Sequence, residues 1–263
     1  MELNDLQKIY QGSKTTVYKG RIEDARREVV VKVLNNEFPS TEQIESFNNE
    51  YEYTTDLNIS GIRQVLGKQK LEGKICLVFE YFGRQTLKEF IAGKHDLSSL
   101  IRIACQISQI LGEIHQRNVI HKDINSNNIL INEKQEVRII DLGLATRFTL
   151  KTQNLFNPEL LEGTLAYISP EQTGRMNRSV DYRSDLYSMG VVLYELFTGQ
   201  LPFQEKDHME LIHSHIARKP DSPDKTGKLV EMDEAPRTLL SKIILIQIQF
   251  PKVSFISMCQ KMN

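Results

Sequence analysis

The spacing of hydrophobic residues changes once along this 263-residue chain, near Leu87. Before Leu87, apolar residues occur in short β-branched runs such as Val29 to Leu34, which are typical of strands. After it they recur every three or four residues from Leu100 to Ile114, which is the period of a helix. A strand-rich part followed by a helix-rich part predicts an α+β fold with two lobes.

The junction between the lobes is predicted at Gly83 to Thr86. The small first lobe, β-rich and antiparallel with one helix, then covers about residues 1–83, and the larger, mainly helical second lobe about residues 84–238. Residues 239–263 have an unusual composition, and we interpret them as a truncated or frame-shifted end. The apolar run Ile243 to Pro251 in this stretch is predicted to be prone to β structure.

Local patterns predict individual elements within each lobe. Alternation along the strand from Val29 to Leu34 places Val30, Lys32 and Leu34 on one face and the other valines on the opposite face. The predicted elements are, in chain order, strands at 16–20, 29–34 and 75–82, a helix beginning at Ser40 with Gln43 as its capping-box partner, a helix at 100–114, strands at 128–131 and 137–140, and a helix at 184–197.

Composition excludes several classes of protein. The net charge is −1, so no general attraction to nucleic acid or to a membrane surface is expected. The start of the chain lacks a signal pattern, and no apolar run reaches the roughly 20 residues that cross a bilayer. The three cysteines have no metal or disulfide spacing and are expected to be reduced thiols. The sequence therefore predicts a cytoplasmic protein.

One polar segment, His121 to Leu130, has the spacing of a catalytic loop. Asp123 is followed five residues later by Asn128. In phosphoryl transfer, such an Asp orients the attacking hydroxyl and accepts its proton, while such an Asn holds a divalent cation on the nucleotide phosphates. Thirteen residues after Asn128, Asp141 follows an apolar strand and precedes Leu142 and Gly143. A carboxylate there can bind Mg²⁺, and Gly143 is expected to let the chain turn sharply.

Taken together, these residues resemble the eukaryotic-type protein kinase family over roughly residues 5 to 220. The resemblance implies that Lys32 holds the α- and β-phosphates of ATP and pairs with a glutamate eighteen residues on, Glu50. Glu52 is the competing candidate, and the register to the residues that follow favours Glu50. The resemblance also implies that Asn128 and Asp141 bind Mg²⁺ and that Asp123 is the catalytic base.

The resemblance implies an adenine site as well. Val17 and Val30 would form its roof and Leu130 its floor. Phe79 lies at the gatekeeper position, beside the entrance to the space behind the adenine. The backbone from Glu80 to Phe82 would form the hinge between the lobes.

Two later segments extend the resemblance. Gly163 to Glu171 is similar to the segment that docks a peptide substrate, and Asp185 matches an aspartate that supports the catalytic loop. Residues 172–178 and 182–185 are closest to the amino-terminal kinase modules of large cyanobacterial sensor proteins, which carry further signalling domains. The alternative for Asp185 is a purely structural role as a helix N-cap.

The chain departs from the family pattern at four places. Of the three glycines expected in the phosphate loop, only Gly12 is present, which predicts weaker ATP binding. Asn125 replaces a lysine that helps neutralise the transferred phosphoryl group, and Lys122 replaces an arginine. In the family, the residue at the position of Glu171 pairs with an arginine near the end of the second lobe. This chain has no arginine after Arg237, which predicts that Glu171 lacks a partner.

These features predict an ATP- and Mg²⁺-dependent serine/threonine protein kinase in signal transduction. Its partner would be a protein substrate, with no nucleic acid and no membrane. Two alternatives stay open: a pseudokinase that binds nucleotide with little transfer activity, favoured by the missing glycines and Asn125, and a small-molecule phosphotransferase, disfavoured by the segment from Gly163 to Glu171.

Overall fold

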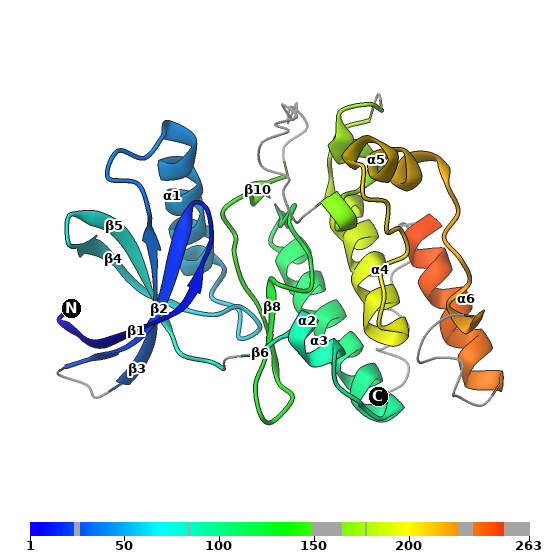
Figure 1. The fold of residues 1–263 in the computed structure, drawn as a ribbon, viewed down its shortest axis with the longest axis horizontal. Coiled ribbons are helices and arrows are strands. Elements are labelled where there is room, and N and C mark those ends of the chain that lie inside the picture. The colour runs from blue at the N-terminus through cyan, green and yellow to red at the C-terminus, as the bar shows by residue number, and fades with distance from the viewer. Residues whose placement is uncertain (24–26, 84, 149–164, 177, 226–233, 250–263) are drawn as a thin grey trace. The chain divides into compact units, whose positions relative to one another are not determined.

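The computed structural model describes residues 1–23, 27–83, 85–148, 165–176, 178–225 and 234–249. It divides into two compact units, the first formed by Met1–Gly83 with Arg138–Ala145 and the second by Arg84–Val137 with Thr146–Asn263. The first unit is built on an antiparallel sheet and the second is mainly helical (Figure 1). The predicted α+β class is therefore confirmed.

The first unit contains a five-stranded antiparallel sheet with the strand order β1-β2-β3-β5-β4 and the helix α1 (Figure 1). Two of its strands, β1 and β4, were not predicted, because their sequences are largely polar. The elements of the first unit are β1 (Leu3–Gln11), β2 (Thr15–Ile22), β3 (Arg27–Leu34), α1 (Thr41–Leu57), β4 (Val65–Leu71) and β5 (Lys74–Glu80).

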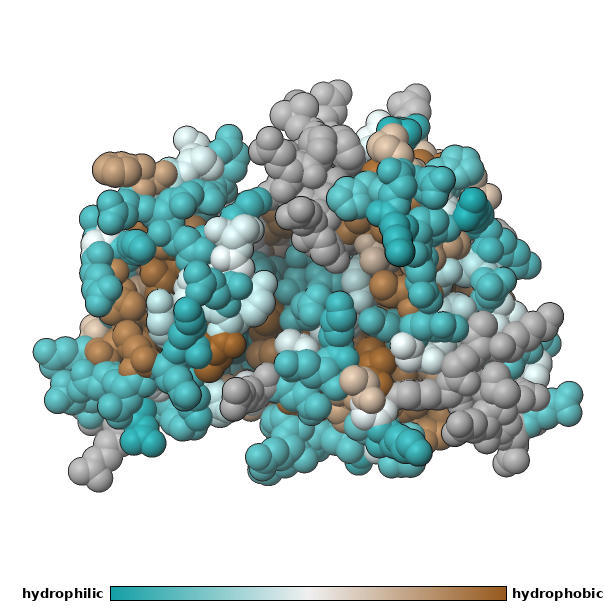
Figure 2. All heavy atoms as spheres, in the orientation of Figure 1, coloured by the Kyte–Doolittle hydropathy of each residue, from teal (hydrophilic) through white to brown (hydrophobic). Residues whose placement is uncertain are grey.

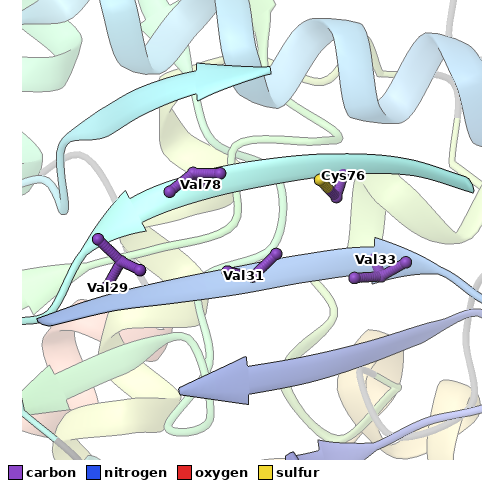
Figure 3. Packing of buried hydrophobic residues seen from close by; sticks show 5 residues of the cluster. All are labelled: Val29, Val31, Val33, Cys76 and Val78. Atoms are coloured by element: carbon purple, nitrogen blue, oxygen red, sulfur yellow. The ribbon is translucent and has the colours of Figure 1, made fainter. Parts of the chain in front are cut away.

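The central strand β3 separates two apolar layers, as its alternation predicted. Val29, Val31 and Val33 lie on one face, opposite Cys76 and Val78 of β5 (Figure 3). Every member of this cluster is at most 5% exposed. The opposite face of β3 carries Val30 and Leu34, which pack with residues of α1 and β5. Lys32 lies between them in the alternation and therefore points to the same side.

Helix α1 begins where the capping pattern predicted. The Ser40 side chain accepts a hydrogen bond from the Gln43 amide, and the Gln43 side chain accepts one from the Ser40 amide. These two bonds satisfy amides that would otherwise have no partner at a helix start. The helix ends at Asn58, whose left-handed backbone (φ 39°) stops it.

The second unit is organised around α4, which lies between α3 and α6 (Figure 1). Every residue of α4 from Ser184 to Thr198 is buried. Within β9 the chain passes from the second unit, which includes Val137, to the first, which includes Arg138–Ala145. The remaining elements are β6 (Gln85–Thr86), α2 (Leu87–Ile91), α3 (Leu97–Gln116), β7 (Val119–Ile120), β8 (Ile129–Ile131), β9 (Val137–Ile139), β10 (Thr146–Arg147), the 3-10 helices η2 (Leu165–Tyr167), η3 (Pro170–Thr173) and η4 (Pro223–Lys225), α4 (Tyr182–Thr198), α5 (His208–Ala217) and α6 (Glu234–Gln249).

The apolar run near the end of the chain is helical, so the prediction of a β-prone stretch is wrong for its described part. Residues up to Gln249 belong to α6, and 250–263 lie outside the described residues. Leu240, Ile244 and Ile248 are buried at intervals of four residues, which is the spacing of one helix face. Packing against α4 outweighs the strand preference of isoleucine, which is a weak and context-dependent effect.

Apolar side chains are gathered inside each unit. On the face drawn in Figure 2, hydrophilic side chains cover most of the surface, and hydrophobic ones show through in small patches. Cys76 is buried and Cys105 half-buried, and both are free thiols, while Cys259 lies outside the described residues. Within the described ranges, no helix combines the length and the hydropathy that crossing a membrane requires.

Candidate active site

The ammonium group of Lys32 is the centre of the polar site in the first unit. It lies 2.7 Å from Glu50 Oε2 on α1 and 3.0 Å from Asp141 Oδ2, which follows β9. Burial alone would lower the pKa of Lys32, but Asp141 and Glu50 raise it above its ordinary value. Lys32 is therefore a permanent cation that bridges two carboxylates.

Of the two glutamates considered for Lys32, the structure brings Glu50 to it. Glu50 is 2% exposed and faces the sheet, whereas Glu52 is exposed on the other side of α1. The two residues differ because positions two apart on a helix point in different directions. Burial raises the pKa of the Glu50 carboxyl, and Lys32 opposes that shift.

The backbone around Asp141 has a strained conformation. Asp141 has a φ of 66°, in the left-handed region that residues other than glycine rarely adopt. Gly143 lies in a turn that is closed by a 3.1 Å hydrogen bond from the Ala145 amide to the Leu142 carbonyl, so the chain turns there as expected. Glycine also fits the packing at this position, because a Cβ on Gly143 would collide with the Ser46 side chain and lie 3.3 Å from the Ser46 carbonyl oxygen of α1.

A second buried cation, Arg63, was not anticipated from the sequence. Its guanidinium lies 4.4 Å from the centre of the Phe79 ring, and the residue is 8% exposed. Its Nε has no hydrogen-bond partner among the described residues. Burial lowers the pKa of Arg63, while Glu50, Asp141 and Glu80 act in the opposite direction. The ring beneath the guanidinium supplies a cation–π contact.

The loop between β1 and β2, which the sequence predicts to be the phosphate loop, is closed by hydrogen bonds. The Gly12 amide donates to the Thr15 carbonyl at 2.9 Å. The Asn35 side chain donates to the Gly12 carbonyl at 2.9 Å and the Ser13 carbonyl at 3.2 Å, and accepts from the Thr16 hydroxyl at 2.6 Å. The Gly12 N–H is thus already used within the loop.

The residues predicted to line the adenine site belong to both units. Val17, Val30 and Phe79 share one apolar cluster of the first unit, and Leu130 of β8 is 6% exposed in the second. Of the residues predicted to form the hinge, Glu80 pairs through its carboxylate with Arg138, and the Phe82 ring centre lies 4.6 Å from the same guanidinium.

In the second unit, two asparagine side chains hold Asp123. Asn128 Nδ2 donates to Asp123 Oδ2 at 2.7 Å and to its carbonyl at 3.0 Å. Asn125 Nδ2 donates to Asp123 Oδ1 at 2.9 Å, and Asn125 Oδ1 accepts from the amides of Asn127 and Asn128. Asn125 is 4% exposed. The residue that replaces the expected lysine therefore orients Asp123 and organises the loop.

Asp185 holds the backbone of the segment that precedes Asp123, as the resemblance implied. Its carboxylate accepts hydrogen bonds from the amides of His121 at 2.8 Å and Lys122 at 2.7 Å, and from His115 Nε2 at 2.8 Å. The N-cap of α4 is Asp181, so the alternative role for Asp185 is wrong. Burial alone would raise the pKa of Asp185, but these bonds lower it.

The segment after residue 164 contacts both the catalytic loop and α4. The Tyr167 hydroxyl donates to Glu195 Oε2 at 2.6 Å and lies 2.8 Å from Ser126 Oγ. Burial and Glu195 raise the pKa of the Tyr167 phenol. Glu171 accepts a hydrogen bond of 2.5 Å from the Ser184 hydroxyl, so the expectation that it lacks a partner is wrong. Gly163 and Thr164 lie outside the described residues.

Mg²⁺ prefers carboxylate and amide oxygens and is usually held by one or two protein groups together with substrate phosphates. The Asp141 carboxylate and the Asn128 amide oxygen have this chemistry. In the described part of the chain, no group of three or more His, Cys, Asp or Glu side chains forms a metal site. Asp141 belongs to the first unit and Asn128 to the second, and each carries an oxygen atom of the kind that binds Mg²⁺.

Comparison with known proteins agrees with this chemistry. Residues 3–250 match the family model described as the protein kinase domain. A probable serine/threonine-protein kinase of Clostridium perfringens is 32% identical over 83% of this chain and 32% of that protein. The serine/threonine-protein kinase pkn3 of Myxococcus xanthus is 31% identical over 90% of this chain and 45% of that protein.

A vertebrate protein matches at a similar level. The RAF proto-oncogene serine/threonine-protein kinase of Xenopus laevis is 31% identical over 94% of this chain and 41% of that protein. The chain spans less than half the length of these curated relatives. Since the family model covers nearly all of its residues, the chain belongs to the protein kinase family.

Proposed function

We propose that this chain transfers the γ-phosphoryl group of Mg-ATP to a serine or threonine hydroxyl of a protein substrate. The observation that carries the proposal is the Lys32 ammonium, bonded to both Glu50 and Asp141. The two carboxylates hold the ammonium group of Lys32 in one place. An ammonium group held in this way is well suited to keep phosphate oxygens in a fixed position.

The residues of the first unit would position the nucleotide. Lys32 would bind the α- and β-phosphates, and Glu50 would keep its ammonium from moving. Val17, Val30 and Phe79 would contact the adenine, together with Leu130, and the backbone of Glu80 to Phe82 would bond its edge. Mg²⁺, held by Asp141 and Asn128, would neutralise charge on the phosphates.

The chemical step would use Asp123. The substrate hydroxyl oxygen forms a bond to the γ-phosphorus as the bond from that phosphorus to the β–γ bridging oxygen breaks. The hydroxyl proton passes to the Asp123 carboxylate, and ADP leaves with the electron pair of the broken bond. Asn125 and Asn128, which each bond one Asp123 oxygen, would aim the carboxylate at the hydroxyl.

The choice of serine and threonine over tyrosine is supported by the relatives, which are named as serine/threonine-protein kinases. The cytoplasmic location and the similarity to cyanobacterial sensor modules stay predictions from the sequence. So does the absence of nucleic acid and membrane partners.

The test is phosphoryl transfer by the purified chain with Mg²⁺ and γ-labelled ATP, with and without a basic protein substrate. The matched control is Asp123→Asn, which keeps the size of the side chain and removes its charge. We expect label on serine or threonine with the wild-type chain and at least a hundredfold less with the control. Label at the level of the control, with ATP still bound, would instead support the nucleotide-binding alternative.

A further inference from the structure

The catalytic loop of the second unit is connected to the segment 165–173 at two points, one on each side of Asp123. On the amino-terminal side, Gln172 Nε2 donates to the Lys122 carbonyl at 2.8 Å. On the carboxyl-terminal side, Ser126 Oγ lies 2.8 Å from the Tyr167 hydroxyl. Both contacts join positions more than 40 residues apart, so they constrain the loop far more than local turns do.

The direction of the second bond follows from the protons available. The Tyr167 hydroxyl has one proton and donates it to Glu195 Oε2 at 2.6 Å. Ser126 must therefore donate its own proton to the Tyr167 oxygen. The three residues joined by these hydrogen bonds, Ser126, Tyr167 and Glu195, are all buried, with exposures of 0%, 2% and 6%. Since a buried hydroxyl without a partner is costly, this hydrogen-bond network is fixed in one arrangement.

The first bond acts on the peptide group that precedes Asp123. Lys122 has a φ of 67°, a conformation that costs about 1–3 kcal/mol in a residue other than glycine and persists only when neighbours impose it. Asp185 holds the Lys122 amide at 2.7 Å and Gln172 holds its carbonyl. The Gln172 side chain is itself oriented by Ser169, whose hydroxyl donates to Gln172 Oε1 at 2.9 Å.

We propose that Gln172 and Ser126 are positioning residues that align Asp123 with the substrate-docking segment. This inference rests on the proposed function, because it assigns Asp123 as the base and 165–173 as the docking segment. The two bonds make the position of the base depend on the segment that would hold the substrate hydroxyl. Both residues belong to the second unit, whereas Lys32, Glu50 and Asp141 belong to the first, so their loss should affect phosphoryl transfer more than ATP binding.

The test compares Ser126→Ala and Gln172→Met with matched controls in the same unit. Ser108→Ala removes another fully buried hydroxyl, which bonds the Ala104 carbonyl within α3. Gln106→Met removes another bridging carboxamide, which joins α3 to Gln135 and Val137. Each control loses the same chemical group without a link to the catalytic loop.

We expect each positioning variant to lower kcat for a protein substrate about 3- to 10-fold, the loss expected for one neutral hydrogen bond, with the KM for ATP within twofold of wild type. Both controls should keep wild-type kcat. Hydrogen exchange at the amides of residues 124–128 should speed up in the two positioning variants and not in the controls.

Unchanged kcat and unchanged exchange in the positioning variants would overturn the proposal. So would an equal loss of kcat in the controls, since the effect would then come from general destabilisation. If the wild-type chain itself transfers no phosphoryl group, the proposed function fails, while the exchange measurement still decides whether the two bonds hold the loop.

Discussion

The Asn35 side chain donates hydrogen bonds to the carbonyls of Gly12 and Ser13, at 2.9 Å and 3.2 Å, in the loop predicted to bind phosphate. A glycine-poor loop cannot rely on backbone freedom to adopt a tight conformation. Here a side chain from the end of β3 fixes the loop instead. We therefore expect Asn35→Ala to raise the KM for ATP about 3- to 10-fold, the effect of one or two neutral hydrogen bonds, with kcat within twofold.

Asn36→Ala is the matched control for this variant. Asn36 is exposed and bonds Gln43 at 3.4 Å, away from the loop. Steady-state kinetics over a range of ATP concentrations, together with calorimetric ADP binding, would measure both variants. An unchanged KM in Asn35→Ala would show that the loop keeps its conformation without this side chain.

The pairing of Lys32 with Glu50 predicts a large difference between neighbouring glutamates. Glu50→Gln keeps the shape of the side chain but loses a charge-assisted bond of 2.7 Å to Lys32. Such bonds contribute about 1.5–3 kcal/mol, so kcat/KM should fall about 10- to 100-fold. Glu52→Gln, on the exposed side of the same helix, should stay within twofold of wild type. Equal values for the two variants would contradict the role of Glu50.

His215 makes stability depend on pH. It is 4% exposed, bonds the Tyr187 hydroxyl at 2.8 Å and lies near the Glu205 carboxylate. Burial lowers the pKa of His215 to about 4, below the roughly 6.5 of the unfolded chain. The unfolded state therefore binds the proton first, and stability falls as pH drops from about 6.5 towards 4.

Between pH 7 and pH 5 this one residue should lower the free energy of unfolding by about 2 kcal/mol. Urea unfolding at the two pH values would measure the loss, and His215→Gln should show a pH dependence smaller by that amount. His213→Gln, at an exposed position of α5, should keep the wild-type dependence. The same dependence in both variants would place the titrating group elsewhere.

The Ser184 hydroxyl replaces the arginine that Glu171 was expected to need. Because Ser184 is fully buried and donates to a carboxylate at 2.5 Å, Ser184→Ala should lower the free energy of unfolding by about 2 kcal/mol. Ser179→Ala, which removes an exposed serine hydroxyl, serves as the control and should change stability by less than about 0.5 kcal/mol. A loss no greater than that of the control would mean that water can satisfy Glu171.

The parts of the site that could be predicted from sequence are those with fixed spacing. Strand alternation places Lys32 on its face of β3, and the distance along the chain distinguishes Glu50 from Glu52. The roles of Asn35, Ser126 and Gln172 could not be predicted, since each acts through a bond to a distant backbone or hydroxyl group. Arg63 was missed for a related reason: a guanidinium over a buried ring has no sequence pattern.

The two strands that were not predicted have largely polar sequences. Strands β1 and β4 interrupt their apolar residues with polar ones, and both lie at the edges of the sheet, where one side of the strand faces water. For α6 the sequence suggested a strand where the structure has a helix. Its isoleucines raised the apparent strand preference, although the buried residues Leu240, Ile244 and Ile248 have the four-residue spacing of a helix face.

The buried positions of α6 have a consequence for the substitutions that this helix can accept. Leu240, Ile244 and Ile248 are buried on a helix that contacts α4, and leucine, isoleucine and methionine can exchange at such positions at a cost usually below about 1.5 kcal/mol. The catalytic loop depends on particular atoms that exchange less freely. The sequence of α6 can therefore vary more than that of the catalytic loop, while the helix keeps its apolar face buried.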